Sequence, residues 1–192
     1  MSWKNSDKII NYLLRNPFAN NSINKVSRDL GISVGSAFKL LKQMESEGLV
    51  TSKSAGHALF YALNFTNPEA RKLAELVLLK DGSNLNPLSR VVKKDLEKVN
   101  ADAIILFGSV LSKKEPSDID VLIVVGKKDV KKVQNSLKEV SRLHVKTISP
   151  LFLTPKDLKT GFRKQDEVVV DIIKSGKIVR GEDEIVKILG EL

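Results

Sequence analysis

Two aspartates placed two residues apart are the residues of this sequence best suited to do chemistry. Asp118 and Asp120 begin the apolar run 118–125, and Gly108 and Ser109 end the apolar run before it. Residues two apart in a strand point to the same side, which places the two carboxylates roughly 6–7 Å apart on one face. Magnesium prefers oxygen ligands and is usually held by one or two carboxylates together with substrate phosphates. The pair therefore predicts a Mg²⁺ site.

The Gly-Ser pair would form the phosphate-binding half of such a site. Glycine lets the backbone approach a triphosphate closely, and the N–H groups that open a following helix can donate to phosphate oxygens, as can the Ser109 hydroxyl. The expected cofactors are Mg²⁺ and a nucleoside triphosphate, with ATP the first to test. An ordinary turn at Gly108 and an ordinary surface start to a strand at Asp118 are the plainer alternative.

These residues resemble the signature of the DNA polymerase beta-like nucleotidyltransferase superfamily, in which a Gly-Ser pair precedes an Asp-x-Asp or Asp-x-Glu pair by a similar distance. The closest likeness is to the minimal nucleotidyltransferases of prokaryotes, and it covers about residues 85–181. The resemblance implies that Asp118 and Asp120 are catalytic and bind the metal, and that Gly108 and Ser109 bind the nucleotide. It also implies transfer of a nucleoside monophosphate to a hydroxyl of a nucleic acid or of a partner protein.

The sequence departs from the family pattern at a third carboxylate, which members carry on a later strand beside the pair. The corresponding stretch here, residues 144–154, contains no Asp or Glu. Thr147 or Ser149 stands in that place, and a hydroxyl is not a general base at neutral pH without help. Nucleotide binding is therefore better supported than transfer. Three acids of the following segment could replace the missing one: Asp166, Glu167 and Asp171.

The segments around the aspartates predict the elements that position them. A helix is expected over about 87–99, and a crossover helix over 127–143 that leads to a strand over 145–153. Thr154 and Pro155 are typical of the start of a further helix. A short strand then follows over 176–181.

A second, independent pattern occupies the first third of the chain. Ser22 is expected to cap a short helix that Gly31 ends, and Ser33 to cap a longer helix over 34–47. Two helices joined by a tight turn favour a helix-turn-helix. A hairpin with a polar turn over 52–57 is predicted to follow.

This stretch, about residues 6–65, resembles the winged helix-turn-helix domains of prokaryotic transcription regulators. The Gly-Ile-Ser start of the longer helix and its Met-Glu-Ser-Glu-Gly-Leu-Val ending are typical of that family. The resemblance implies binding to double-stranded DNA, with the longer helix in the major groove and the hairpin beside it. Seven residues would then contact DNA: Ser33, Val34, Ser36, Lys39, Lys42, Lys53 and His57.

Helical spacing divides the longer helix into two faces. Ala37, Leu41 and Met44 are expected in the core, and Phe38 on the outer side. Lysines on an exposed helix face are usually just solvated, and Phe38 could instead dock against the second domain. A module that binds only other proteins is therefore an alternative to a DNA reader.

Composition is compatible with both patterns and decides neither. The 192 residues include 32 Lys and Arg against 23 Asp and Glu, a net charge of +9 that favours polyanions such as nucleic acid. Cysteine is absent, which excludes disulfides, Cys-based zinc sites and a thiol nucleophile. No apolar stretch reaches the ~20 residues of a membrane span, so we expect a cytoplasmic protein without membrane contact.

The predicted fold class is α+β, in three segments: a winged helix-turn-helix domain over 1–66, a connecting helix and linker over 67–84, and a nucleotidyltransferase-like domain with a small mixed sheet over 85–192. The connecting helix has an apolar face that could dock or form a homodimer. Three functions follow as alternatives. They are a nucleotidyltransferase, a DNA-binding regulator whose degenerate second domain only senses nucleotide, and an interaction protein.

Overall fold

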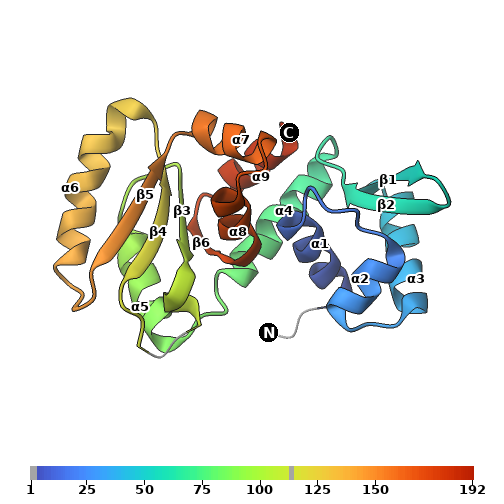
Figure 1. Cartoon of the computed structure of the whole chain (residues 1–192), viewed down its shortest axis with the longest axis horizontal. Coiled ribbons are helices and arrows are strands. Elements are labelled where there is room, and N and C mark those ends of the chain that lie inside the picture. The colour runs from blue at the N-terminus through green and yellow to red at the C-terminus, as the bar shows by residue number, and fades with distance from the viewer. Residues whose placement is uncertain (1–3, 113–114) are drawn as a thin grey trace. The chain divides into compact units, whose positions relative to one another are not determined.

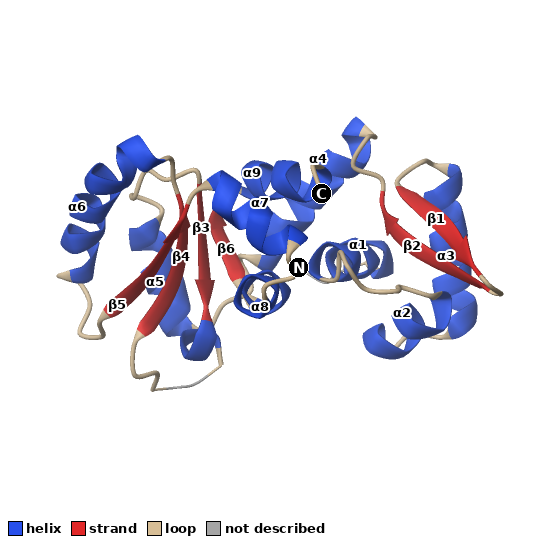
Figure 2. Ribbon diagram, turned by 45° about the horizontal axis from the view of Figure 1, so that its top comes forward, coloured by secondary structure: helices blue, strands red, loops and turns tan. Residues whose placement is uncertain are grey.

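The structure is a computed structural model that describes residues 4–112 and 115–192. It is α+β, and the chain divides into two compact units, Met1–Val77 and Leu78–Leu192. The boundary between them falls inside α4 (Pro68–Asp81), the predicted connecting helix. Figure 1 labels the elements along the chain, and Figure 2 colours them by type.

The first unit begins with helices and ends in a hairpin: α1 (Asn5–Arg15), α2 (Ile23–Leu30), α3 (Val34–Ser46), β1 (Val50–Ala55) and β2 (Ala58–Leu63). The two predicted helices and their caps are confirmed. Ser22 accepts a hydrogen bond from the backbone of Lys25, Gly31 ends α2 in the left-handed conformation, and Ser33 accepts from the backbone of Ser36. Helix α1 was not among the predicted elements.

The hairpin turn is shorter than predicted. The polar residues 52–55 belong to β1, and only Gly56 and His57 form the turn. Strand β1 is polar because one of its sides faces solvent, while its partner β2 supplies the apolar contacts; Ser52 pairs with Tyr61, which is buried. Cross-strand pairing therefore overrides the turn propensity of serine at this position.

The second unit is built around one mixed sheet with the strand order β5-β4-β3-β6. Its strands and the helices that precede or join them are α5 (Pro87–Leu96), β3 (Ala103–Phe107), η1 (Gly108–Leu111), β4 (Ile119–Val124), η2 (Lys127–Asp129), α6 (Val130–Ser141) and β5 (Ile148–Leu153). The elements that follow are α7 (Pro155–Arg163), α8 (Glu167–Ser175), β6 (Lys177–Arg180) and α9 (Glu182–Gly190). Strand β4 runs antiparallel to β3 and parallel to β5.

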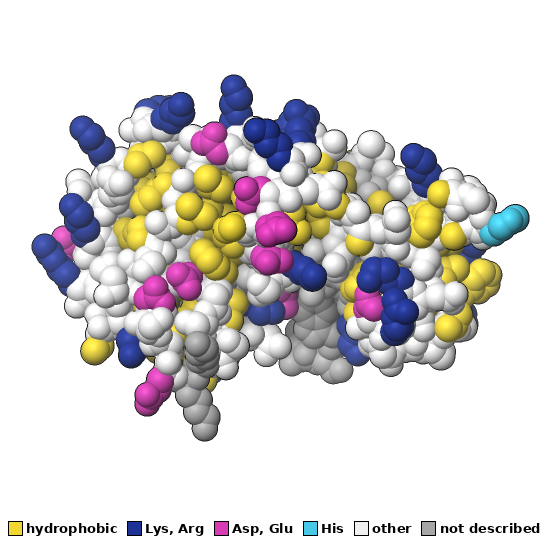
Figure 3. Space-filling view, viewed as in Figure 1, with side chains coloured by type: hydrophobic (Ala, Val, Ile, Leu, Met, Phe, Trp, Pro, Cys, Tyr) yellow, Lys and Arg dark blue, Asp and Glu magenta, His cyan; other side chains and the backbone are white. Residues whose placement is uncertain are grey.

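One face of this sheet is fully covered and the other only in part. Helices α5 and α6 bury the first face, which contributes Ile104, Leu106, Ile119, Val121 and Ile123 to the core. Helices α8 and α9 contact β3 on the opposite face. That face is turned toward the viewer in Figure 1, and in the same orientation Figure 3 shows apolar side chains gathered over β4 and β5 with acidic side chains beside them.

Two predicted boundaries in this unit are wrong. Strand β5 begins at Ile148, three residues later than predicted, because its ladder starts where Ile148 meets Ile119 of β4. Val145, predicted to lie in the strand, is fully exposed in the preceding turn. Helix α5 ends at Leu96 rather than near Val99.

Strand β5 lies at one edge of the sheet and contains a proline. Its ladder bonds come from odd-numbered residues: the Ile119 amide donates to the Thr147 carbonyl over 2.9 Å, and that of Val125 to the Leu153 carbonyl over 3.0 Å. The backbone of Pro150 therefore points away from β4. A missing N–H at this position costs the sheet no internal hydrogen bond.

Candidate functional site

The end of β3 places Gly108 directly against Asp120. Phe107, the last residue of β3, pairs with Asp120 of β4, and Gly108 follows with a φ of 73°. A Cβ atom at Gly108 would overlap the carboxylate oxygen Oδ2 of Asp120. Both the left-handed backbone and the close approach require glycine here, so the structure brings together the two halves of the predicted site.

Asp118 is held by two hydroxyl groups. The Ser117 hydroxyl donates to Asp118 Oδ1 over 2.8 Å, and the Ser149 hydroxyl of β5 donates to Asp118 Oδ2 over 3.2 Å. Each carboxylate oxygen thus has one partner and keeps lone pairs for a further ligand. The two hydrogen bonds orient this carboxylate beside that of Asp120.

Asp120 is in an environment that disfavours its charge. Burial raises the pKa of the Asp120 carboxyl above its ordinary value, and the neighbouring charge of Asp118 raises the pKa further. Two carboxylates that share a site repel one another unless a cation lies between them. A divalent cation would remove this cost, so the electrostatics of the pair fit the predicted Mg²⁺.

The turn after Gly108 is fixed by side chains of α5. The Asn86 amide and the Ser89 hydroxyl both donate to the Val110 carbonyl over 2.8 Å. The helix expected to open after this turn is the short 3₁₀ helix η1. Within the described residues, the buried Ser109 hydroxyl oxygen has no hydrogen-bond partner. A buried polar atom without a partner is costly, and rotation of the Ser109 side chain would be needed for its hydroxyl to meet a phosphate oxygen.

Ser149 occupies the position beside the aspartate pair on the neighbouring strand. It is the register partner of Asp120, as the sequence analysis anticipated for either Thr147 or Ser149. The three acids considered as replacements lie on α8 or at its start. Asp166 accepts a hydrogen bond from the backbone of Val169 and caps α8, and Glu167 and Asp171 are exposed. Among the described residues, no group of three or more His, Cys, Asp or Glu is arranged to hold a metal ion.

An apolar surface adjoins the acid pair on the partly covered face of the sheet. Asp120 shares this face with Leu122 and Val124, which are fully buried. Leu151, the register partner of Leu122 on β5, is 36% exposed. Beside the aspartates, this face therefore exposes Leu151 of β5, while the apolar residues of β4 are covered.

The first unit presents its own candidate site on the outer side of α3. Ala37, Leu41 and Met44 are buried, as predicted, and Val34 and Phe38 are each 51% exposed. The other predicted contacts on this helix are exposed as well, as are those of the hairpin: Ser33, Ser36, Lys39, Lys53 and His57.

Lys42 differs from the other predicted DNA contacts. It is partly buried, and its ammonium lies 2.8 Å from the Glu45 carboxylate, which also accepts a hydrogen bond from Ser52 of β1. The Glu45 hydrogen bond raises the pKa of Lys42. Lys42 therefore takes part in joining α3 to the hairpin, and its charge is already compensated.

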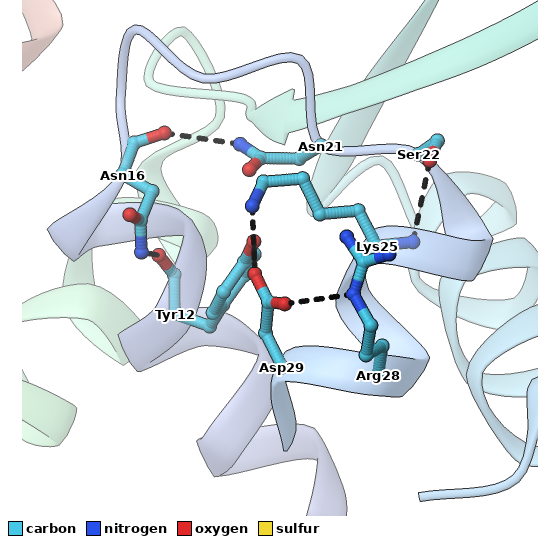
Figure 4. Close-up of polar contacts among 7 residues, drawn as sticks. All are labelled: Tyr12, Asn16, Asn21, Ser22, Lys25, Arg28 and Asp29. Carbon is cyan, nitrogen blue, oxygen red and sulfur yellow. Dashed lines mark hydrogen bonds and ion pairs between the residues drawn. The ribbon is translucent and has the colours of Figure 1, made fainter. Parts of the chain in front are cut away.

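A polar network attaches α2, the helix before α3, to α1. The Tyr12 hydroxyl and the Lys25 ammonium each donate to Asp29 over 2.8 Å, and the Arg28 guanidinium lies 3.5 Å from the same carboxylate (Figure 4). Hydrogen bonds from Lys25 and then Tyr12 lower the pKa of Asp29 to about 2. This network holds α2 against α1, and α2 directly precedes α3 in the chain.

Two contributions to the aspartate site were missed from the sequence. Ser117 was not among the candidate residues, although it adjoins Asp118 in the sequence and donates to its carboxylate. Ser89 gave no local signal, because its partner Val110 lies 21 residues away.

Comparisons with protein-family models, with curated proteins and with solved structures give no match to this chain. In the described part of the chain, no helix combines the length and the apolar character that crossing a membrane requires.

Proposed function

We propose that this protein binds Mg²⁺ and a nucleoside triphosphate at Asp118 and Asp120, and transfers a nucleoside monophosphate to a hydroxyl. The proposal adds a DNA-binding winged helix-turn-helix in the first unit, which would direct or regulate the second. One observation carries the nucleotide site: Asp118 directly precedes β4 and Asp120 lies at its start, with a glycine turn packed directly against the Asp120 carboxylate.

The residues of the site have distinct roles in this proposal. Asp118 and Asp120 would hold Mg²⁺, since both carboxylates retain free lone pairs and the raised pKa of Asp120 reflects a charge that lacks compensation. The Ser109 hydroxyl and the backbone at Gly108 would bind phosphate oxygens, which the unpartnered Ser109 oxygen supports. Bound magnesium would neutralise the phosphate charge on which transfer depends.

The test is a calorimetric titration with ATP, GTP, CTP and UTP, with and without Mg²⁺, because binding can be measured before the acceptor is identified. Magnesium-dependent binding should be present in the wild type and lost in Asp118→Asn/Asp120→Asn. Asp183→Asn is the matched control, since Asp183 is an exposed aspartate on α9 of the same unit. No binding of any nucleotide to the wild type would refute the proposed site.

A second candidate function is a DNA-binding regulator that senses nucleotide without transferring it. The observation in its favour is Ser149, a neutral hydroxyl at the register position beside Asp120 where a general base would be useful. Incubation with each α-labelled triphosphate in a cell extract, which supplies acceptor hydroxyls, separates the two candidates. Release of pyrophosphate with label on an acceptor supports transfer, and magnesium-dependent binding without release supports sensing.

A homodimer in the cytoplasm, where nucleotide and DNA are both available, completes the proposal. Leu76 and Leu79, three residues apart on α4, are 45% and 49% exposed, which supports self-association through this helix. Light scattering on the full chain tests this part: a monomer mass at high protein concentration would contradict it.

A further inference from the structure

The outer side of α3 is apolar where a solvated helix would be polar. Val34 and Phe38 are four residues apart, so they lie on the same side of the helix one turn apart. Each is 51% exposed. Single exposed apolar residues are ordinary, but two that adjoin at the start of an exposed helix form a small contact surface.

Gly35, between them in the sequence, is not required by the fold. Its backbone is helical, and no atom of the described residues beyond its own turn and chain neighbours lies within 4 Å of a Cβ placed there. Glycine in a helix costs about 1 kcal/mol relative to alanine. Because the packing of the chain does not explain Gly35, its lack of a side chain leaves room for something outside the chain to approach α3 closely.

The charges around this surface favour a polyanion. Among the described residues, neither Lys39 on α3 nor Lys53 on β1 has an ion-pair partner, and β1 is joined to α3 through Ser52 and Glu45. The chain through Thr66 contains eight Lys and Arg against four Asp and Glu. An apolar surface flanked by uncompensated lysines is complementary to the major groove of DNA, which has phosphates along its walls.

The polar side chains at the start of α3 are already engaged. The Ser33 hydroxyl donates to Ser36 Oγ over 2.9 Å, and Ser33 Oγ accepts from the Ser36 backbone over 3.1 Å. The Ser33 hydroxyl therefore caps the helix and is poorly placed to read bases, while the Ser36 hydroxyl keeps its own O–H donor. Apolar contact by Val34 and Phe38 is a separate means by which this part of α3 can distinguish one base pair from another.

We infer that Val34 and Phe38 recognise thymine methyl groups in the major groove, with Gly35 allowing the close approach. The inference rests on the proposed DNA-binding function. It predicts that the protein prefers DNA sites that contain thymine. The C5-methyl of thymine is the apolar group that the four bases present in this groove. Exposed valine and phenylalanine side chains match it in polarity.

The experiment removes the methyl groups without changing charge or hydrogen bonding. Fluorescence anisotropy compares the full-length protein on two duplexes of equal length, one of alternating A and T and the other with uracil in place of every thymine. The wild type should bind the thymine duplex about fourfold more tightly for each methyl group buried, from a transfer free energy of about 0.8 kcal/mol. Val34→Ala/Phe38→Ala should bind the two duplexes equally.

Controls separate loss of methyl recognition from loss of DNA binding. Val91→Ala removes a valine of 56% exposure from α5 in the other unit and should leave the thymine preference unchanged. Lys39→Ala should weaken binding to both duplexes alike. Gly35→Ala should raise the melting temperature while it weakens binding to the thymine duplex.

The outcomes distinguish the two levels of the proposal. Equal wild-type affinity for the thymine and uracil duplexes overturns methyl recognition and leaves DNA binding standing. An unchanged preference in the Val34→Ala/Phe38→Ala variant overturns the assignment to these residues. No binding to either duplex at low salt overturns the proposed DNA-binding function itself, and this inference with it.

Discussion

Asp120 is subject to opposite requirements from folding and from the proposed binding of magnesium. Burial and the charge of Asp118 raise the pKa of its carboxyl, so ionisation of Asp120 opposes folding of the metal-free protein. Stability should therefore fall as the pH rises from the ordinary aspartate pKa of 3.8 through the raised pKa. The same uncompensated charge would attract a cation to this part of the sheet.

Asp120→Asn should consequently stabilise the metal-free protein at neutral pH and abolish the response to magnesium. In the wild type, Mg²⁺ at a hundredfold excess over its Kd should stabilise the fold by about 2.7 kcal/mol. Thermal unfolding in EDTA and in Mg²⁺ measures both effects. A variant that melts below the wild type in EDTA, or that still responds to Mg²⁺, would contradict this account.

Ser149→Asp tests whether a missing general base limits transfer. The new carboxylate would lie at the register position of Asp120, and a positioned base typically contributes 10²- to 10⁴-fold to a rate. We expect release of pyrophosphate to rise by at least roughly a hundredfold in this variant. Ser149→Ala is the matched control and should show no rise. An inactive Ser149→Asp protein that still binds nucleotide would favour a sensor.

Part of this site could be predicted from residue types and spacing alone. The close approach of Gly108 to Asp120 was predictable, because two apolar runs around a short loop form adjacent strands whose ends meet. The hydrogen bond from Ser149 to Asp118 was not, because it depends on the register of β5 against β4, 31 residues away. The pairing of Lys42 with Glu45 was missed although it is local, because residues three apart on a helix are neighbours.

At the scale of elements, helix ends were predicted better than strand ends. Ser22, Ser33 and Thr154 each accept a backbone hydrogen bond three residues on, a contact made within the local sequence. Strand ends depend on a partner strand. Ser52 belongs to β1 because Tyr61 lies opposite it, and Val145 is left out of β5 although its side chain favours strands.

The joint between α1 and α2 gives the first unit a specific dependence on pH. The pKa of Asp29 is lowered to about 2, so its ionised form stabilises the folded state. This contribution is complete above the ordinary pKa of 3.8 and is lost as the pH falls from 3.8 to about 2. Asp29→Asn should make the melting temperature less sensitive to pH in this interval.

Circular dichroism melts of the wild type and Asp29→Asn between pH 5 and pH 2 measure the effect. Glu69→Gln serves as the control, because Glu69 is an exposed acid in the first turn of α4 within the same unit. If the melting temperatures of the wild type and Asp29→Asn changed equally with pH over this interval, ionised Asp29 would contribute nothing to the stability of the fold.

At the scale of the whole molecule, the two candidate sites belong to separate compact units. A substitution in one site should therefore weaken or abolish its own binding activity and leave the other unchanged. Asp118→Asn should abolish magnesium-dependent nucleotide binding and leave DNA affinity unchanged. Lys39→Ala should spare nucleotide binding and reduce the slope of log affinity against log salt by about one phosphate contact, roughly 0.9. Calorimetry and anisotropy on both variants provide the comparison. Loss of both activities in either variant would contradict two separable sites.

Pro150 also has a consequence for how copies of this protein behave in concentrated solution. An edge strand displays unpaired backbone groups, and a strand from another molecule can bond to them and begin aggregation. Pro150 removes a donor from the middle of the outward edge of β5, so an incoming strand cannot complete a ladder there. A residue that costs the sheet no internal hydrogen bond thereby helps to end its growth at four strands.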